Sequence, residues 1–243
     1  MRVAIISDMH GNRTAFEAVL ADLRETAPDL ILHGGDLAMG GASPAEVVDR
    51  IRDLGWPGVM GNVDEMLPRP EAFEEFAKTA PHLQALWKQI EENAGATRAA
   101  LGAERIAWLG ELPRVIKEGC IALVHASPET TWRAPAADAA DAEFESVYGP
   151  LERTVVVYGH IHRPFIRSAD GPGDPVTIAN SGSVSLSYDG DRRASYLLLD
   201  DFVPSIRRVD YDLDQEIRAL AACGLPHSDW IVRTLQTAGP QMP

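Results

Sequence analysis

The chain has 243 residues, of which 45% are hydrophobic and 24% charged, and its 36 acidic against 22 basic side chains give a formal net charge of −14. This composition predicts a globular protein that can bury a large core. The acidic balance argues against nonspecific binding to nucleic acid or to an anionic membrane, although bound cations would still allow an anionic substrate.

The sequence also bears on the compartment. No apolar run is long enough to span a bilayer, and no signal peptide precedes the first apolar run, which favours a cytoplasmic protein. The two cysteines, Cys120 and Cys223, exclude a disulfide framework and fit a reducing compartment. Neither lies in a metal-ligand pattern, so we expect both to be buried apolar side chains.

The first part of the chain alternates short apolar runs with amphipathic stretches. We expect strands at 2–7, 30–33 and 58–60, and helices at 14–23 and 44–54. The second helix has a strong start signal, with a serine cap followed by proline and, two residues later, glutamate. This alternation with short connections predicts a parallel sheet with right-handed crossovers.

Residues 67–112 differ in character. Helical periodicity covers 72–92, with Pro81 as a break point, and then 97–109, and Pro113 ends it. We interpret this segment as a helical insertion that lies over the functional site as a cap or lid. A pair of ordinary packing helices is the alternative.

The second half of the chain is rich in strands. A hairpin is expected over 115–124, followed by a short helix at 138–148. Further strands and a helix are then expected at 154–158, 165–167, 176–179, 195–199, 206–209 and, for the helix, 212–222. The spacing of the strands favours an antiparallel or mixed second sheet. The tail from Thr234 is expected to be weakly ordered.

Polar residues follow one predicted strand after another. They are Asp8, His10, Asp36, Asn62, His125, His160 and His162. Because ligands bind beyond the carboxyl ends of parallel strands, these side chains could converge on one pocket. Two carboxylates, an amide and four histidines are too many for one tetrahedral zinc, but suit two metals that share a carboxylate. Such a pair is typical of phosphate-ester hydrolysis.

Each of these residues also has a structural interpretation. Asp8 would serve as a helix cap, and Asp36 and Asn62 as turn residues. His125 would be an ordinary strand-end histidine, and a His-x-His pair such as His160 and His162 is common in loops. For most of these residues taken singly, the structural interpretation is favoured. For all seven together, it would require seven unrelated residues to lie at the same edge of the fold by coincidence.

The same residues fall in five short blocks, in this order: Asp8-x-His10, Gly35-Asp36, Gly61-Asn62, His125 and Gly159-His160-x-His162. Together they resemble the signature blocks of the calcineurin-like metallophosphoesterase superfamily, and the small phosphodiesterases of the YfcE type look most similar. The segment Asn180-x-Gly182-Ser183-Val184 resembles one that follows the fifth block in that branch. The resemblance implies an α/β fold, a four-layer α/β/β/α sandwich of two packed mixed sheets flanked by helices. It would form a single domain over 1–243, with the helical insertion at about 67–112.

The resemblance also implies roles for the individual residues. One metal would be held by Asp8, His10, Asp36 and His162, and the other by Asp36, Asn62, His125 and His160. Asp36 would bridge the two ions. Asp36, Asn62 and His125 would be catalytic, with a metal-bridging hydroxide as the nucleophile, and Asn12 and Asn62 would bind the substrate phosphate.

The chain departs from the family in the third block. Many members carry there a histidine that assists the leaving group, whereas this chain has Val63. YfcE-type members also lack this histidine, so the departure favours substrates whose leaving group needs little protonation. Asp64 is then expected to be structural, and His33 to be a strand-end residue beside the site.

The sequence therefore predicts a dinuclear metal-dependent hydrolase, in the first place a phosphodiesterase. A dinucleoside polyphosphate hydrolase and a phosphomonoesterase or protein phosphatase are the alternatives, and a non-catalytic binding scaffold is the competing class. The expected cofactors are two divalent ions, with Mn first and Fe, Ni or Zn as the others. The expected partner is a small phosphorylated substrate, with no nucleic-acid scaffold and no membrane, and self-association stays open.

Overall fold

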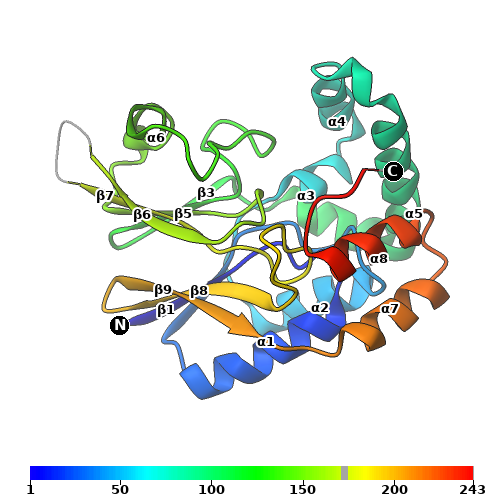
Figure 1. Ribbon diagram of the computed structural model, residues 1–243, viewed down its shortest axis with the longest axis horizontal. Helices are drawn as coiled ribbons and strands as arrows, with labels where there is room; N and C mark the ends of the chain where they lie inside the picture. Colours follow the sequence, from blue (N-terminus) through cyan, green and yellow to red (C-terminus); the bar gives the residue numbers. More distant parts are fainter. Residues whose placement is uncertain (171–174, 243) are drawn as a thin grey trace.

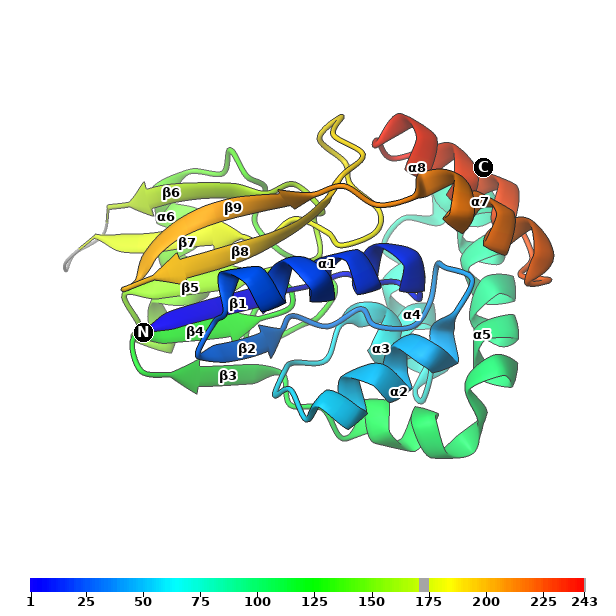
Figure 2. The same cartoon turned by 90° about the horizontal axis from the view of Figure 1, so that it is seen from below.

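The computed structural model describes residues 1–170 and 175–242. Within these residues the strands form two mixed sheets that lie face to face (Figure 1). Helices cover both outer faces, and a further group of helices gathers at one end of the sandwich (Figure 2). None of the described helices is both long enough and apolar enough to cross a membrane.

The first sheet has the strand order β2-β1-β8-β9. Its strands are β1 (Arg2–Ile6), β2 (Leu30–His33), β8 (Ala194–Asp200) and β9 (Val203–Val209). The expected parallel pairing holds for β1 and β2, but β8 lies antiparallel on the other side of β1. The strand expected at 58–60 was wrong: these residues form a single parallel bridge, from Gly58 to His33, before the chain turns into the next helix.

The second sheet has the order β3-β4-β5-β7-β6. Its strands are β3 (Val115–Glu118), β4 (Ile121–Val124), β5 (Val155–Tyr158), β6 (Phe165–Ala169) and β7 (Val176–Asn180). The hairpin and the mixed character were both predicted correctly. The last two strands, β8 and β9, were wrongly expected here. Because Ala194 to Leu199 are buried on both faces, β8 fits a central position beside β1.

Three apolar layers hold the sandwich together. Between the sheets, Ile5 of β1 packs with Leu123 and Val157 of the second sheet. The outer face of the first sheet is covered by α1 (Arg13–Thr26) and α2 (Pro44–Leu54), and that of the second by α6 (Asp141–Tyr148) with the 3₁₀ turn η2 (Gly149–Leu151). The α/β/β/α architecture implied by the family resemblance is confirmed.

The helices at the end of the sandwich come from two distant parts of the chain. The first group is α3 (Asn62–Met66), α4 (Pro70–Ala77), η1 (Pro81–Leu83) and α5 (Gln84–Gly110). Pro81 begins η1, which confirms the expected break, and Gly102 leaves helical geometry inside α5 at φ 71°. The second group is α7 (Leu213–Ala222) and α8 (Ser228–Thr237), and the C-terminus lies beside α5 (Figure 1).

Two expectations about the C-terminal part were wrong. The tail was expected to lose order from Thr234, but α8 continues to Thr237 because Ile231 and Leu235 pack against Leu220 of α7. Cys223 was expected to be buried, but it ends α7 and is exposed, while Cys120 is half-buried. Both cysteines are free thiols.

His33 ends β2 and is completely buried. A Cβ placed on Gly58 would lie 2.1 Å from its imidazole ring, so the ring lies flat against that glycine. Neither ring nitrogen has a hydrogen-bond partner among the described residues. Burial lowers the pKa of His33 to about 3, so the side chain is neutral in the folded protein.

In the unfolded state His33 should therefore be protonated below pH 6.5, whereas in the folded state it stays neutral down to about pH 3. The contribution of His33 to the free energy of unfolding is therefore fully present above pH 6.5. Below that pH it falls by about 1.4 kcal/mol per pH unit, down to about pH 3. His33→Phe keeps a flat ring but cannot be protonated. Its free energy of unfolding should therefore depend less steeply on pH than that of the unchanged protein. Urea titrations between pH 7 and 5 measure it; an unchanged slope would contradict the prediction.

Candidate metal centre

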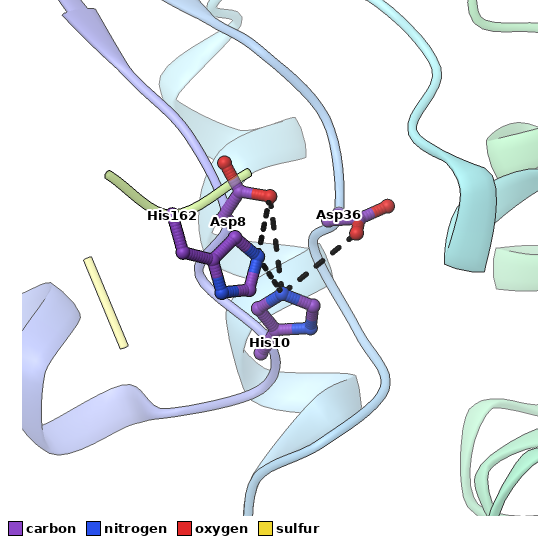
Figure 3. A group of neighbouring side chains, drawn as sticks. All are labelled: Asp8, His10, Asp36 and His162. Carbon is purple, nitrogen blue, oxygen red and sulfur yellow. Dashed lines mark hydrogen bonds and ion pairs between the residues drawn. The ribbon is translucent and has the colours of Figure 1, made fainter. Parts of the chain in front are cut away.

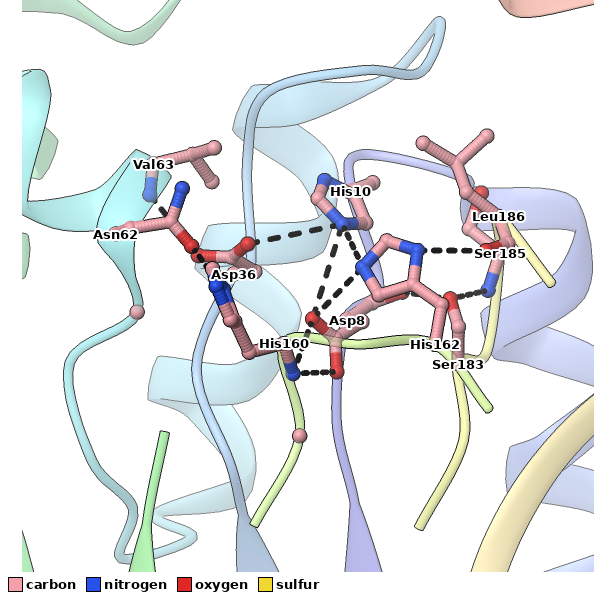
Figure 4. Close-up of polar contacts among 12 residues, drawn as sticks. Asp8, His10, Asp36, Asn62, Val63, His160, His162, Ser183, Ser185 and Leu186 are labelled. Atoms are coloured by element: carbon pink, nitrogen blue, oxygen red, sulfur yellow. Dashed lines mark hydrogen bonds and ion pairs between the residues drawn. The ribbon is translucent and has the colours of Figure 1, made fainter. Parts of the chain in front are cut away.

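The seven candidate ligands lie at one edge of the sandwich, and Figure 4 labels all of them except His125. Asp8 and His10 follow β1, and Asp36 follows β2. His125 follows β4, and the pair His160 and His162 follows β5, while Asn62 is the first residue of α3. The two sheets thus deliver ligands to the same place, as expected for the ends of parallel strands.

Five of these residues adopt left-handed backbone geometry. The φ values lie between 48° and 66° for Asp8, His10, Asp36, His160 and His162. This region costs about 1–3 kcal/mol for a residue other than glycine, and such strain gathers at functional sites. Hydrogen bonds between the loops hold it in place: the amide of Asp8 donates to Gly35 and that of His10 to Asp36, each at 2.9 Å.

The first cluster consists of Asp8, His10, Asp36 and His162, and ligand atoms from all four lie within 4.8 Å of one another (Figure 3). His162 Nε2 is 3.1 Å from Asp8 Oδ1 and 3.1 Å from His10 Nε2. His10 Nε2 is 3.7 Å from Asp36 Oδ2. Carboxylate oxygens and imidazole nitrogens that converge in this way could hold a metal ion.

The second cluster is centred on the Asn62 amide oxygen. That oxygen lies 2.9 Å from His125 Nε2 and 2.9 Å from His160 Nδ1. His125 Nε2 is also 3.5 Å from Asp36 Oδ1. The two carboxylate oxygens of Asp36 therefore face different clusters, Oδ2 toward His10 and Oδ1 toward His125. This is the geometry of a shared ligand.

Backbone carbonyls set the orientation of three histidine rings. Nδ1 of His10 donates to Met39, that of His125 to Gly34 and that of His162 to Leu186, at 2.6 to 2.7 Å. With the proton held on Nδ1, the lone pair of each ring lies on Nε2, which is the atom that faces the clusters. Second-sphere contacts of this kind are typical of histidine ligands to metals.

Burial shapes the charges of the centre. It lowers the pKa of His10 and of His160 to about 3 and also lowers that of His125, so these rings stay neutral and able to bind a metal. Burial raises the pKa of Asp36, and the charges of Asp8 and Asp64 raise it further. Bound cations would offset this repulsion between carboxylates.

Asp64 supports the centre from behind, in the structural role expected for it. Its side chain is completely buried. Its carboxylate accepts from the amides of Asp36 at 2.7 Å, Leu37 at 2.9 Å and Gly61 at 3.1 Å. Burial raises the pKa of Asp64 to about 6 despite these three donors. One side chain thus fixes the loop after β2 to the start of α3.

Two glycines of the sequence blocks are required by close approach. A Cβ on Gly61 would lie 2.0 Å from Asp36 Oδ1, and one on Gly159 would lie 2.2 Å from Ser7 Oγ and 2.6 Å from Asp8 Oδ2. Any larger residue would therefore displace a candidate ligand.

Asn12 does not take the substrate-binding position expected for it. Its side chain is completely buried, its Oδ1 accepts from Ala15 as the N-cap of α1, and its Nδ2 donates to Ser185. Both ends of the amide are thus occupied within the protein. The helix cap considered for Asp8 is provided by Asn12 instead. Val63 lines the cavity beside the ligands and offers no polar group there.

The loop after β7 contributes residues that sequence reasoning did not assign. Ser183 Oγ donates to the carbonyl of Asp8 at 3.0 Å, and the carbonyl of Leu186 holds His162. The ring of Tyr188 lies 4.6 Å from that of His162. The signal was present in the segment Asn180-x-Gly182-Ser183-Val184, which runs along the first block.

The donor set fits two divalent ions. Oxygen and imidazole ligands in this mixture suit Mn, Fe, Ni or Zn, and all seven side chains converge without rearrangement. Asp8, His10, Asp36 and His162 would hold one ion, and Asp36, Asn62, His125 and His160 the other.

The chain resembles known proteins along nearly its whole length. The uncharacterised protein MJ0912 of Methanocaldococcus jannaschii is 31% identical over an alignment 248 residues long. The alignment covers 94% of this chain and 95% of that protein. A metallophosphoesterase from Sphaerobacter thermophilus has 27% identity and a TM-score of 0.78, over 98% of this chain and 99% of that one. The hypothetical protein PH1004 of Pyrococcus horikoshii shares the fold, with 18% identity, a TM-score of 0.80 and 99% of each chain covered. Residues 1–201 match the family model described as the calcineurin-like phosphoesterase superfamily domain, and the chain belongs to that superfamily.

Proposed function

We propose that the chain is a metal-dependent phosphodiesterase with two divalent ions, acting on a small phosphorylated substrate. Membership of a phosphoesterase superfamily supports a hydrolase. The observation that carries the proposal is the position of Asp36, whose two carboxylate oxygens face two separate groups of histidine nitrogens.

The roles of the residues follow from their contacts. When bound, two divalent ions supply Lewis acidity toward the phosphate oxygens and lower the pKa of water enough for hydrolysis at neutral pH. Asp36 provides the charge that lets two cations lie side by side. The carbonyl contacts of His10, His125 and His162 keep the rings oriented, and the amide oxygen of Asn62 completes the second cluster.

One feature supports a diester rather than a monoester. Two cavities meet at His160: one is also lined by His10 and Asp36, and the other, of about 720 Å³, by Ser127 and Arg133. A diester carries two organic groups on one phosphate, and two cavities could receive them. Val63 cannot donate a proton to a leaving group, which suits esters of acidic alcohols.

The test is metal analysis followed by hydrolysis of bis-p-nitrophenyl phosphate by the purified protein with Mn²⁺. We expect two divalent ions per chain. We also expect the protein to hydrolyse bis-p-nitrophenyl phosphate faster than it hydrolyses the monoester p-nitrophenyl phosphate. A protein that holds two ions but turns over neither substrate would overturn the proposal. A protein that binds no metal would favour the non-catalytic scaffold.

Because His160 and His162 lie in different clusters, their replacement should remove different ions. His160→Ala should first release the ion near Asn62 and His125, and His162→Ala the ion near Asp8 and His10. Metal content by mass spectrometry should fall from two ions to about one in each variant. Anomalous scattering from crystals would locate the ion that remains.

The control for these two variants is His82→Ala, which replaces an exposed histidine on η1. It should keep both ions. Loss of the same ion from the His160 and His162 variants would contradict the assignment of the two clusters.

A further inference from the structure

A cavity of about 210 Å³ lies against the two clusters, and much of its wall is aromatic. The aromatic residues are Phe73, Phe76, Trp87, Trp132, Tyr188 and Trp230. They come from α4, α5, α8 and the loops after β4 and β7, so segments far apart in the sequence meet here. The helical insertion and the C-terminal helix thus both contribute to this aromatic wall.

The aromatic wall is mostly apolar, and its rings pack on one another. The rings of Phe76 and Trp132 stack at 5.0 Å, and Trp87 meets Phe76 edge-on at 5.8 Å. The three indole N–H groups are all used elsewhere: that of Trp87 donates to Ala80, that of Trp132 to Glu65 and that of Trp230 to Gln241. Ring faces that are held in this way bind flat apolar groups at little entropic cost.

The cavity contains no cation for a second phosphate. Among the described residues that line it, none is a lysine or an arginine. The nearby Arg69 and Arg114 pair with Glu65 instead, at 2.6 and 2.9 Å. Recognition of an extra phosphate normally uses such cations. The part of the substrate that enters the cavity should therefore be uncharged.

One polar group in the wall lacks a partner. Asn93 of α5 is 1% exposed, and among the described residues nothing donates a hydrogen bond to its Oδ1. This oxygen is itself buried, so it gives a bound ligand no acceptor in the cavity.

We propose that this cavity takes one uncharged aromatic ring, as the organic group of a phosphate ester whose phosphate binds at the candidate metal ligands. The inference rests on the proposed function. The volume is below the roughly 300–1,000 Å³ of pockets for drug-sized ligands, which suits a single ring system. A dinucleoside polyphosphate, with two nucleosides and several phosphates, does not fit in this cavity alone.

The experiment uses calorimetry of the Mn²⁺-loaded protein with phosphonates, which are not hydrolysed. Phenylphosphonate should bind at least about tenfold more tightly than methylphosphonate, because only the former buries a ring.

Two tryptophan variants test the wall separately. Trp230→Leu should reduce the preference for phenylphosphonate over methylphosphonate by about fivefold or more. Trp108→Leu, on α5 but outside this cavity, should leave it unchanged. Equal binding of phenylphosphonate and methylphosphonate would overturn the inference and leave the proposed function intact. Failure of every phosphonate to bind the metal-loaded protein would overturn both.

Discussion

Asp36→Asn should lower kcat/KM for bis-p-nitrophenyl phosphate by at least about a thousandfold, which corresponds to about 4 kcal/mol of transition-state stabilisation. Asp36 is the only carboxylate that faces both clusters among the described residues, with Oδ2 3.7 Å from His10 Nε2 and Oδ1 3.5 Å from His125 Nε2. A neutral amide of the same size removes the charge that balances two adjacent cations. The metal content should fall below two ions per chain.

The fold should survive this change. Asparagine can still accept the hydrogen bond that the amide of Val63 donates to Asp36 Oδ1 at 3.0 Å. Removal of a buried carboxylate whose pKa is raised should stabilise the metal-free protein slightly. Asp53→Asn, an exposed aspartate on α2, is the matched control and should keep full activity. An Asp36→Asn protein with two ions and more than a tenth of the activity would contradict the bridging role.

The convergence of the ligands could be predicted because it depends on local patterns. Each short apolar run ends in polar residues, and chain direction alone then places Asp8, Asp36 and His160 at the same edge of the sandwich. The resemblance added the division into two clusters, and the distances agree with it. The function of Asn12 could not be predicted, because an amide after a strand can equally well cap a helix or face a ligand.

What the sequence left open depends on contacts between distant segments. The apolar pattern of β8 indicates a buried strand but does not name its neighbour, so its place beside β1 was missed. In α8, Ile231 and Leu235 share one apolar face. The closeness of this segment to the chain end nevertheless led to the prediction of weak order, which was wrong. The aromatic wall is likewise invisible locally, because Phe76 and Trp132 meet only after the insertion folds over the sheet ends.

Asp64→Ala should lower the free energy of unfolding of the metal-free protein by about 3–5 kcal/mol. The side chain is fully buried and accepts from the amides of Asp36, Leu37 and Gly61. Its loss would leave three buried N–H groups without an acceptor, each at about 1–3 kcal/mol. The lower part of the summed range is expected, because burial already raises the pKa of Asp64 to about 6 and its removal relieves that cost.

The same change should also weaken metal binding, although Asp64 contacts no ion. The carboxylate joins the backbone that positions Asp36 to the turn that positions Asn62, so both clusters lose their common support. Urea unfolding after chelation measures the stability, and titration with Mn²⁺ measures the affinity, with Asp53→Ala as the exposed control. If Asp64→Ala cost less than about 1 kcal/mol, water would have to satisfy the three amides. Tight binding of two ions in a destabilised Asp64→Ala protein would show that the carboxylate supports only the fold and not metal binding.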